Sequence, residues 1–186
     1  MFTAACTDPL TGLLNRAGWE IGTTDLLTRR RGASTSVTVV VLDIDSLKQI
    51  NDTYGHQAGD RRIEEYAHRW RRSVPRQAVL ARLGGDEFAV CIAGGTSEVV
   101  NQFLRDVERL TPGVSFGAAT HNSPDVSIAE LYAQADAALY QSRGRPCGTV
   151  GRTPRRTSRP STPPAAGRFS ARPGFSAPGP RPPRSS

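Results

Sequence analysis

The chain has 186 residues, with 24 Lys or Arg against 17 Asp or Glu and a formal net charge of +7. Eight arginines and no acidic residue lie in residues 151–186, so the other 150 residues carry 16 basic and 17 acidic side chains, and the basic excess does not define a partner for the folded part. The three cysteines lack metal-binding spacing, which argues against a disulfide scaffold and favours a reduced protein. The sequence has no apolar run of about 18 residues and no signal-peptide pattern, so we expect no membrane span and a cytoplasmic location.

Residues 151–186 differ in composition from the rest of the chain. Nine of these 36 residues are proline, and Phe169 and Phe175 are the only large apolar side chains. Such a segment buries too little apolar surface to offset the entropy lost on ordering, so we expect one domain in residues 1–150 followed by a disordered Arg/Pro-rich tail. The tail's charge fits an arm for nucleic acid or an acidic partner, and a solvated tail without a partner is the simpler interpretation.

Residues 1–150 alternate between helix-like and strand-like patterns. Asp8-Pro9 is a helix-start signal, and Gly84-Gly85 has the composition of a tight hairpin turn. In chain order we predict helices at residues 8–30, 59–74, 96–110 and 127–143, and strands at residues 36–44, 78–83, 87–93 and 113–120. Helical spacing predicts core positions at Ile63, Tyr66, Ala67, Trp70, Val74, Phe103, Tyr132 and Tyr140. The order of elements predicts an α+β sandwich, with helices packed over one mostly antiparallel sheet.

A possible metal site lies where the strand of residues 36–44 ends. Asp43 and Asp45 are two residues apart, so they point to the same side of the strand end. Carboxylates in this position can ligate Mg²⁺, which takes oxygen ligands and often shares them with substrate phosphates. Lys48 lies just beyond and can meet a phosphate as a point charge. The same acidic residues would also occur where a buried strand simply ends in a solvent-exposed loop. The spacing alone does not distinguish a metal site from such a strand end.

The hairpin turn carries a second pair of acidic residues, Asp86 and Glu87. If its strand lies beside the strand of Asp43, three carboxylates converge and repel one another unless a cation lies between them. That arrangement suits two-metal nucleotidyl transfer, in which one metal activates the attacking hydroxyl and the other steadies the triphosphate. Gly84 and Gly85 would let a ligand approach the backbone closely. A turn whose acidic residues only face water is the alternative.

The stretch "RLGGDEF" at residues 82–88 resembles the signature of the GGDEF family, the diguanylate cyclases, which condense two GTP into cyclic di-GMP. Further segments resemble the family's opening motif, its metal and guanine segment, and its closing strand and helix: "DPLTGLLNR" (8–16), "DIDSLKQINDTYGHQAGD" (43–60), "VSFGAA" (114–119) and "ADAALYQSR" (135–143). The resemblance covers about residues 7–145, with the motifs in the family's order. It implies a nucleotide-cyclase and polymerase-palm-like fold, a ferredoxin-like βαββαβ sandwich.

The resemblance also implies a role for each matching residue. Two Mg²⁺ or Mn²⁺ per active site would be held by Asp43, the Ile44 carbonyl, Asp86 and Glu87. Asp86 would accept the proton of the attacking 3′-hydroxyl with support from Glu87, and Lys48 would meet the phosphates. Asn51 and Asp60 would read guanine, because an Asp accepts hydrogen bonds from guanine N1–H and the exocyclic amine, which adenine does not offer together. The other substrate-binding candidates are Gly84 and Gly85 at the turn, Leu47 as an apolar wall, Arg143 at the triphosphate, and His56, whose simpler role is to order its loop.

Several positions depart from the family pattern. Pro75 and Ala78 replace the Arg and Asp of the Arg-x-x-Asp product-inhibition site, so we expect this feedback site to be absent. Leu47 replaces an aromatic residue and keeps the wall apolar. Arg143 stands where the family has Lys, and the second basic residue of the last helix is either Arg145 or is replaced by Cys147. We therefore expect triphosphate binding to be weaker than is typical.

The resemblance as a whole implies a cytoplasmic, Mg²⁺-dependent diguanylate cyclase that releases pyrophosphate and works as a homodimer, without a membrane partner. No sensor or dimerisation segment precedes Thr7, so the domain is expected to associate by itself, to be held by a regulatory or sensor protein, or to be a fragment of something longer. The alternatives are a weak or inactive module that binds GTP or a cyclic dinucleotide, a protein that docks on nucleic acid or an acidic partner through its tail, and a cyclic oligonucleotide synthetase with another product.

Overall fold

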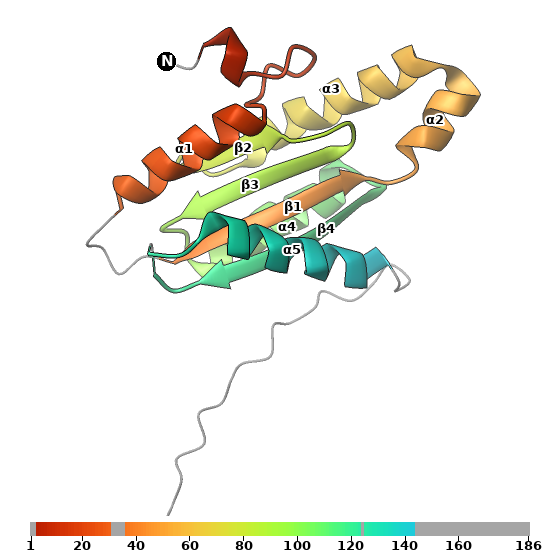
Figure 1. Ribbon diagram of the computed structural model, residues 1–186. Coiled ribbons are helices and arrows are strands. Elements are labelled where there is room, and N and C mark those ends of the chain that lie inside the picture. The colour runs from red at the N-terminus through yellow and green to blue at the C-terminus, as the bar shows by residue number, and fades with distance from the viewer. Residues whose placement is uncertain (1–2, 31–35, 124, 144–186) are drawn as a thin grey trace, which may run out of the picture. The chain divides into compact units, whose positions relative to one another are not determined.

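The computed structural model describes residues 3–30, 36–123 and 125–143 (Figure 1). After a short 3-10 helix, η1 (Ala4–Cys6), the helices are α1 (Arg16–Thr28), α2 (Leu47–Tyr54), α3 (His56–Ser73), α4 (Ser97–Leu110) and α5 (Ile128–Arg143). The strands are β1 (Val37–Ile44), β2 (Ala78–Arg82), β3 (Glu87–Ala93) and β4 (Val114–His121). The predicted tail, Arg145 and Cys147 lie outside the described residues, and Cys6 and Cys91 are free.

The four strands form one sheet in the order β2-β3-β1-β4, and every neighbouring pair is antiparallel. Figure 1 shows α1 and α5 on one face of this sheet, with α3 and α4 on the other. The central strand β1 is buried along nearly its whole length because helices cover both of its faces. This explains why its sequence is a continuous apolar run, and it confirms the predicted α+β sandwich.

Two apolar clusters fill the space between the sheet and the helices. One joins Leu42 and Phe88 of the sheet to Trp70 of α3 and Phe103 of α4. Trp70 packs edge-on against Phe88 with ring centroids 4.8 Å apart, and its indole N–H donates to Thr111 Oγ1 at 3.1 Å. The other cluster lies beneath α1 and α5, and its members include Trp19, Val37, Val39, Val41, Leu131, Ala135 and Leu139. The sheet is thus packed on both faces, which fixes the positions of its strand ends.

The first helix begins at Arg16, so the prediction of a helix from Asp8 was wrong. Asn15 caps the helix by accepting a hydrogen bond from the Gly18 amide at 3.0 Å. Asp8 does not cap a helix, because its carboxylate closes a local turn with the Thr11 amide at 2.9 Å. Gly12 follows with φ of 62°, a left-handed conformation that ends any helical path there.

Helix α2 was not predicted, and α3 begins three residues before the predicted start. The two helices are separated only by Gly55, whose φ of 82° breaks the helical path. Helix α2 has eight residues, and only Leu47 among them is buried. Such a short helix with one core residue gives little periodic signal.

The predicted core positions on the helices were correct for Trp70 and Phe103 and wrong for Tyr140. Trp70 is fully buried and Phe103 nearly so, whereas Tyr140 is 81% exposed. Tyr132 is half-buried at the margin of the cluster beneath α1 and α5. The two tyrosines of α5 therefore differ in their surroundings although both fit an apolar helical spacing.

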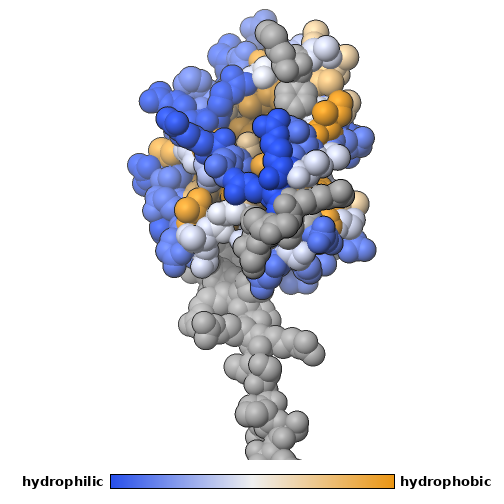
Figure 2. Space-filling view, turned by 90° about the vertical axis from the view of Figure 1, so that its left-hand side faces the viewer, coloured by the Kyte–Doolittle hydropathy of each residue, from blue (hydrophilic) through white to orange (hydrophobic). Residues whose placement is uncertain are grey.

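Hydrophilic residues cover most of the side shown in Figure 2, where hydrophobic residues occur in small groups. The large apolar side chains that are exposed among the described residues are Ile21, Tyr54, Val99 and Tyr140, from four different helices or helix ends. None of the helices described here combines the length and the apolar character that crossing a membrane requires.

Replacement of Gly117 by Ala is expected to destabilise the fold. Helix α5 packs directly on β4 at this glycine, and an added Cβ would overlap the Ala135 carbonyl oxygen and the Leu139 amide nitrogen. These are backbone atoms that cannot turn away, so we expect the free energy of unfolding to fall by about 1–3 kcal/mol. Urea denaturation measures the change. Gly85→Ala is the control because a Cβ there meets nothing within 4 Å, and equal stability of the two variants would contradict the packing argument.

Candidate functional site

The pairing of β1 with β3 brings acidic residues from two distant segments together. Asp43 lies directly opposite Glu87, and the Ile44 amide donates to the Asp86 carbonyl oxygen at 3.1 Å. Side chains that face each other across an antiparallel pair project to the same side of the sheet. Here that side is the one covered by α1 and α5. The condition left open by the sequence, that the hairpin strand lies beside the strand of Asp43, is therefore met.

The acidic side chains at this edge of the sheet disfavour one another's charge. Burial raises the pKa of Asp43, and the charges of Asp86 and Asp45 raise it further, against the opposing effect of Arg143. Burial likewise raises the pKa of Glu87, and Asp43 and Asp86 act in the same direction. A cation placed among these groups would remove the repulsion and favour the charged carboxylates.

Arg143, the last residue of α5, forms an ion pair with the Asp43 carboxylate. Its guanidinium is therefore the positive charge that balances Asp43 in this structure. Within the described ranges, no three Asp, Glu, His or Cys side chains are grouped so as to hold a metal ion. The available donors are nevertheless carboxylate and carbonyl oxygens, which Mg²⁺ and Mn²⁺ prefer, so the residue set fits a divalent cation once Arg143 leaves Asp43.

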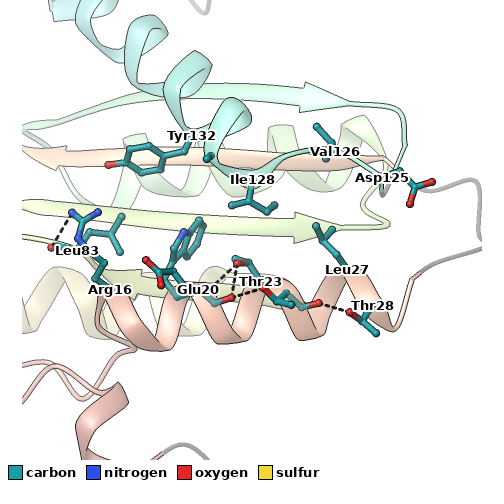
Figure 3. Close-up of a pocket in the computed structure, with 13 residues that line it drawn as sticks. Arg16, Glu20, Thr23, Leu27, Thr28, Leu83, Asp125, Val126, Ile128 and Tyr132 are labelled. Atoms are coloured by element: carbon teal, nitrogen blue, oxygen red, sulfur yellow. Dashed lines mark hydrogen bonds between the residues drawn. The ribbon is translucent and has the colours of Figure 1, made fainter.

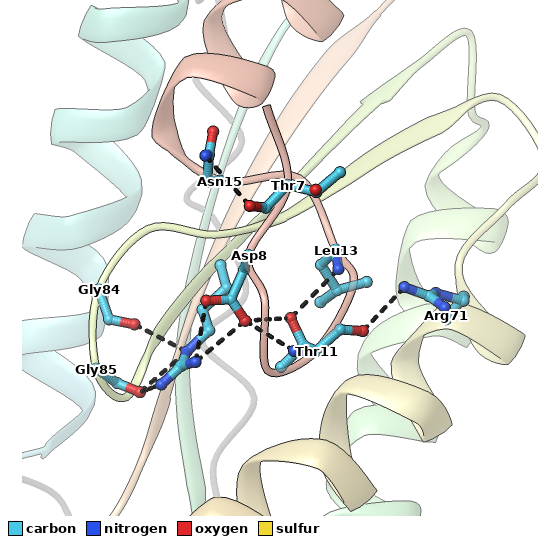
Figure 4. Close-up of polar contacts among 9 residues, drawn as sticks. Thr7, Asp8, Thr11, Leu13, Asn15, Arg71, Gly84 and Gly85 are labelled. Atoms are coloured by element: carbon cyan, nitrogen blue, oxygen red, sulfur yellow. Dashed lines mark hydrogen bonds and ion pairs between the residues drawn. The ribbon is translucent and has the colours of Figure 1, made fainter. Parts of the chain in front are cut away.

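A hydrogen-bond network holds the turn between β2 and β3 (Figure 4). Arg82 donates from Nε to the Gly84 carbonyl oxygen at 3.1 Å and from Nη2 to the Gly85 carbonyl oxygen at 2.8 Å. Its Nη1 also donates to Asp8 Oδ1 at 3.1 Å, and Asp8 accepts from the Thr11 hydroxyl at 2.7 Å. The loop before α1 is thereby attached to the turn.

Sequence reasoning did not assign Asp8 or Arg82 to the site. Asp8 is part of the motif at residues 8–16 and Arg82 is part of the motif at residues 82–88, and this was the only feature of the sequence that could have linked them to the site. Their spacing of 74 residues gives no indication that they pair. Only the packing of the loop against the end of β2 brings the two charges together.

The predicted guanine-reading residues lie on α2 and α3, which pack against each other. Asn51 is on α2, and its buried Oδ1 has no hydrogen-bond partner among the described residues. A Cβ at Gly59 on α3 would overlap this oxygen, so the glycine makes room for the Asn51 side chain. Asp60 follows on α3 and is exposed. A buried acceptor without a donor costs free energy in this arrangement.

The remaining predicted residues divide between core and surface. Leu47 is 6% exposed and belongs to the cluster under α3 and α4. Lys48 and His56 are exposed at the beginnings of α2 and α3. Asp45 accepts a hydrogen bond from the Ser115 hydroxyl at 2.7 Å, which ties the end of β1 to β4.

A pocket of about 680 Å³ lies between α1 and the beginning of α5 (Figure 3). At one end of it, Arg16 donates to the Leu83 carbonyl oxygen at 3.4 Å. Tyr132 also lines the pocket, and its hydroxyl donates to the Glu87 carboxylate. The sequence did not predict that Arg16 or Tyr132 lies near the site. Arg16 was named only as part of the motif at residues 8–16, and helical spacing assigned Tyr132 to the core.

Comparison with known proteins identifies the same region as a family domain. The family model described as "Diguanylate cyclase, GGDEF domain" matches residues 5–146. The chain is 36% identical over 150 residues to an uncharacterised protein of Streptomyces griseus and 33% identical over 157 residues to the diguanylate cyclase DgcS of Shewanella oneidensis. These alignments cover 75% and 79% of this chain but 62% and 53% of the two relatives, so the chain spans only part of their length.

A solved structure supports the match at the level of the fold. The GGDEF domain of DgcB from Caulobacter crescentus, in complex with c-di-GMP, is 32% identical to this chain with a TM-score of 0.68. The similarity covers 77% of this chain and 93% of that one. The palm-like α+β fold implied by the sequence motifs is therefore confirmed.

Replacement of Asp8 by Asn is expected to loosen the turn between β2 and β3. Burial alone would raise the pKa of Asp8, but hydrogen bonds from Thr11 and Arg82 outweigh it and lower the pKa below the ordinary 3.8. A lowered pKa means that the charged form stabilises the fold above about pH 4, and that this contribution is lost as the pH falls through the folded-state value. We expect Asp8→Asn to reduce the free energy of unfolding by about 1–2 kcal/mol at pH 7 and by progressively less below pH 4.

Urea denaturation across this pH range measures the difference between the variant and the wild type. Asp25→Asn is the matched control because the Asp25 side chain forms an exposed ion pair with Arg29, the residue that follows α1, and such pairs contribute little. A loss in Asp8→Asn no larger than in Asp25→Asn would argue against the anchoring role.

Proposed function

The chain belongs to the GGDEF domain family of diguanylate cyclases, and on this basis we propose that it condenses two GTP into cyclic di-GMP with release of pyrophosphate. The observation that carries the proposal is the pairing of Asp43 with Glu87 beside the turn that holds Asp86. The relative DgcS is named a diguanylate cyclase, and the similar domain of DgcB binds c-di-GMP. We place the reaction in the cytoplasm, where GTP is available.

The family typically uses a divalent metal, and we propose two Mg²⁺ or Mn²⁺ ions per active site. Asp43, the Ile44 carbonyl, Asp86 and Glu87 would hold them. When bound, such ions polarise phosphate oxygens and lower the pKa of a coordinated hydroxyl. Asp86 then accepts the proton of the attacking 3′-hydroxyl, and its half-buried position beside β1 suits a group that must face the substrate.

The basic residues bind the triphosphate in this proposal. Arg143 pairs with Asp43 in the structure, so its guanidinium already lies at the metal-binding end and exchanges Asp43 for phosphate oxygens when substrate binds. Lys48 is exposed at the beginning of α2 and contributes a point charge. The turn at Gly84 and Gly85 lets the substrate approach the backbone.

The pair α2 and α3 supplies the guanine readers. Asn51 Oδ1 is an acceptor that lacks a donor among the described residues, and the guanine exocyclic amine supplies one. Asp60 accepts from guanine N1–H and the same amine, which excludes adenine. Leu47 and His56 border this region, the first as an apolar wall and the second as a residue that orders the helix junction.

One domain holds one GTP, so the product forms between two domains that face each other. We propose a transient homodimer, which a regulatory or sensor protein can hold together. The product-inhibition motif is replaced by Pro75 and Ala78, and Ala78 is the first residue of β2. Neither side chain binds a phosphate or a guanine, so we propose that this feedback does not operate.

The ion pair between Arg143 and Asp43 supports a second candidate function. If Arg143 stays on Asp43, it competes with the metal, and the protein is then a weak or inactive module that binds GTP or a cyclic dinucleotide. The tail that would dock on nucleic acid or an acidic partner lies outside the described residues.

An assay for product formation tests the proposed activity. The protein is incubated with GTP or ATP and Mg²⁺ over a range of protein concentrations, and the products are identified by mass. We expect cyclic di-GMP from GTP alone, at a rate that rises faster than linearly with protein concentration because two domains must meet.

The same assay includes Asp86→Ala, which removes the proton acceptor and is expected to lower kcat at least about 100-fold. Glu108→Ala, at an exposed position of α4, is the control. No product at any concentration, with GTP binding retained, would instead support the inactive module, and equal product from Asp86→Ala would reject the assigned role.

Replacement of Gly59 by Ala is expected to weaken GTP binding. The added Cβ displaces the Asn51 side chain, and loss of one hydrogen bond to the base raises the Kd about tenfold. Titration calorimetry with an α,β-methylene GTP analogue measures the affinity. Gln57→Ala, an exposed neighbour on α3, is the control, and unchanged affinity in Gly59→Ala would remove Asn51 from the guanine site.

A further inference from the structure

The hydroxyl of Tyr132 makes a long-range contact with the site. Tyr132 lies in the second turn of α5, and its O–H donates to Glu87 Oε1 at the first position of β3. The two residues are 45 positions apart in the chain, so the contact joins α5 to the strand that leaves the turn. A neutral donor to a carboxylate forms one of the stronger hydrogen bonds in a protein.

The Tyr132 ring is half-buried: it packs against apolar side chains and also lines the pocket between α1 and α5. It packs at the margin of the apolar cluster beneath α1 and α5, whose members include Trp19 and Leu131. Figure 3 shows the ring lying along the sheet, with its hydroxyl pointing toward the end where Arg16 and Leu83 lie. A tyrosine has only two side-chain torsions, so packing of its ring also fixes the position of its hydroxyl.

The second oxygen of Glu87 is left facing the turn. Glu87 Oε2 lies 3.4 Å from the position of a Cβ built on Gly84. The Glu87 main-chain carbonyl oxygen accepts from the Leu83 amide at 2.9 Å, which closes the same turn. Tyr132 therefore occupies one carboxylate oxygen and directs the other toward the place where ligand and metal are proposed to bind.

We propose that Tyr132 is a positioning residue that holds the Glu87 carboxylate in the orientation needed for divalent-metal binding and catalysis. The inference rests on the proposed function but concerns a residue outside the family motifs quoted above. It separates two roles for Tyr132. If Tyr132 only packs, removal of its hydroxyl leaves metal binding and activity unchanged. If it is a positioning residue, removal of the hydroxyl leaves the Glu87 carboxylate without a fixed orientation, and both are reduced.

Tyr132→Phe is the test variant because it keeps the ring and removes only the oxygen. Tyr140→Phe on the same helix is the matched control, since Tyr140 is 81% exposed. Binding of Mn²⁺ is measured from the electron paramagnetic resonance signal of the free ion, in the presence of the α,β-methylene GTP analogue. We expect Tyr132→Phe to raise the Kd for Mn²⁺ roughly threefold to tenfold and to lower kcat by a similar factor, with KM for GTP nearly unchanged.

A double-mutant cycle with Glu87→Gln identifies the path of the effect. If Tyr132 acts through Glu87, its removal has little further effect on Mn²⁺ binding when Glu87 is already replaced. Additive losses in the double variant would overturn the inference. So would wild-type Mn²⁺ binding and kcat in Tyr132→Phe, or loss of its cooperative unfolding transition, which would indicate a purely structural role.

The outcomes distinguish this inference from the proposed function. Absence of product from the wild-type protein rejects the cyclase activity, and the Mn²⁺ measurements then still decide the role of Tyr132. Product from the wild type together with an unaffected Tyr132→Phe rejects the positioning role alone.

Discussion

The register of β1 against β3 sets Asp43 opposite Glu87 at the edge of the sheet, next to the turn that carries Asp86. Half-buried carboxylates lose hydration and repel one another, so this edge requires compensation from its surroundings. The compensation comes from three groups on α1 and α5: the guanidinium of Arg143 and the hydroxyl of Tyr132, which contact Asp43 and Glu87, and the positive charge of Arg16, which acts on Glu87 through the electrostatic field. The packing of α1 and α5 on one face of the sheet therefore also stabilises the acidic edge against the repulsion between its carboxylates.

The turn between β2 and β3 is fixed by a residue of β2 and, through it, by the loop before α1. Arg82 binds the carbonyl groups of Gly84 and Gly85 and reaches Asp8 in the loop before α1. Because the charge of Asp8 is also bound by Thr11, the loop and the turn form one connected unit. A turn that is fixed in this way is preorganised, which is the property that electrostatic catalysis would require in the proposed reaction.

Most of the fold could be predicted because strong local patterns coincide with tertiary burial. The apolar run of β1 and the glycine turn between β2 and β3 were sufficient for the strands and the hairpin, and the stripe on α3 correctly indicated a core helix around Trp70. Prediction was wrong where local signals compete. Asp8-Pro9 has the form of a helix start, but binding to Thr11 and Arg82 takes the Asp8 side chain away from capping.

The sequence by itself identified Asp43, Asp86 and Glu87 and the glycines before Asp86 as candidates, because they stand in motifs that resemble those of the GGDEF family. That the two acidic segments meet at one edge depends on the pairing of β1 with β3, which their spacing left open. Tertiary structure alone decided which groups face them. Tyr132 and Tyr140 fit the same helical spacing, and only the packing of α5 turns one hydroxyl to Glu87 and the other to solvent. The pairing of Arg143 with Asp43 and of Arg82 with Asp8 likewise depends on contacts between segments far apart in the chain. Local sequence patterns specify which face of an element is apolar, but the partner of a polar side chain depends on how whole elements pack.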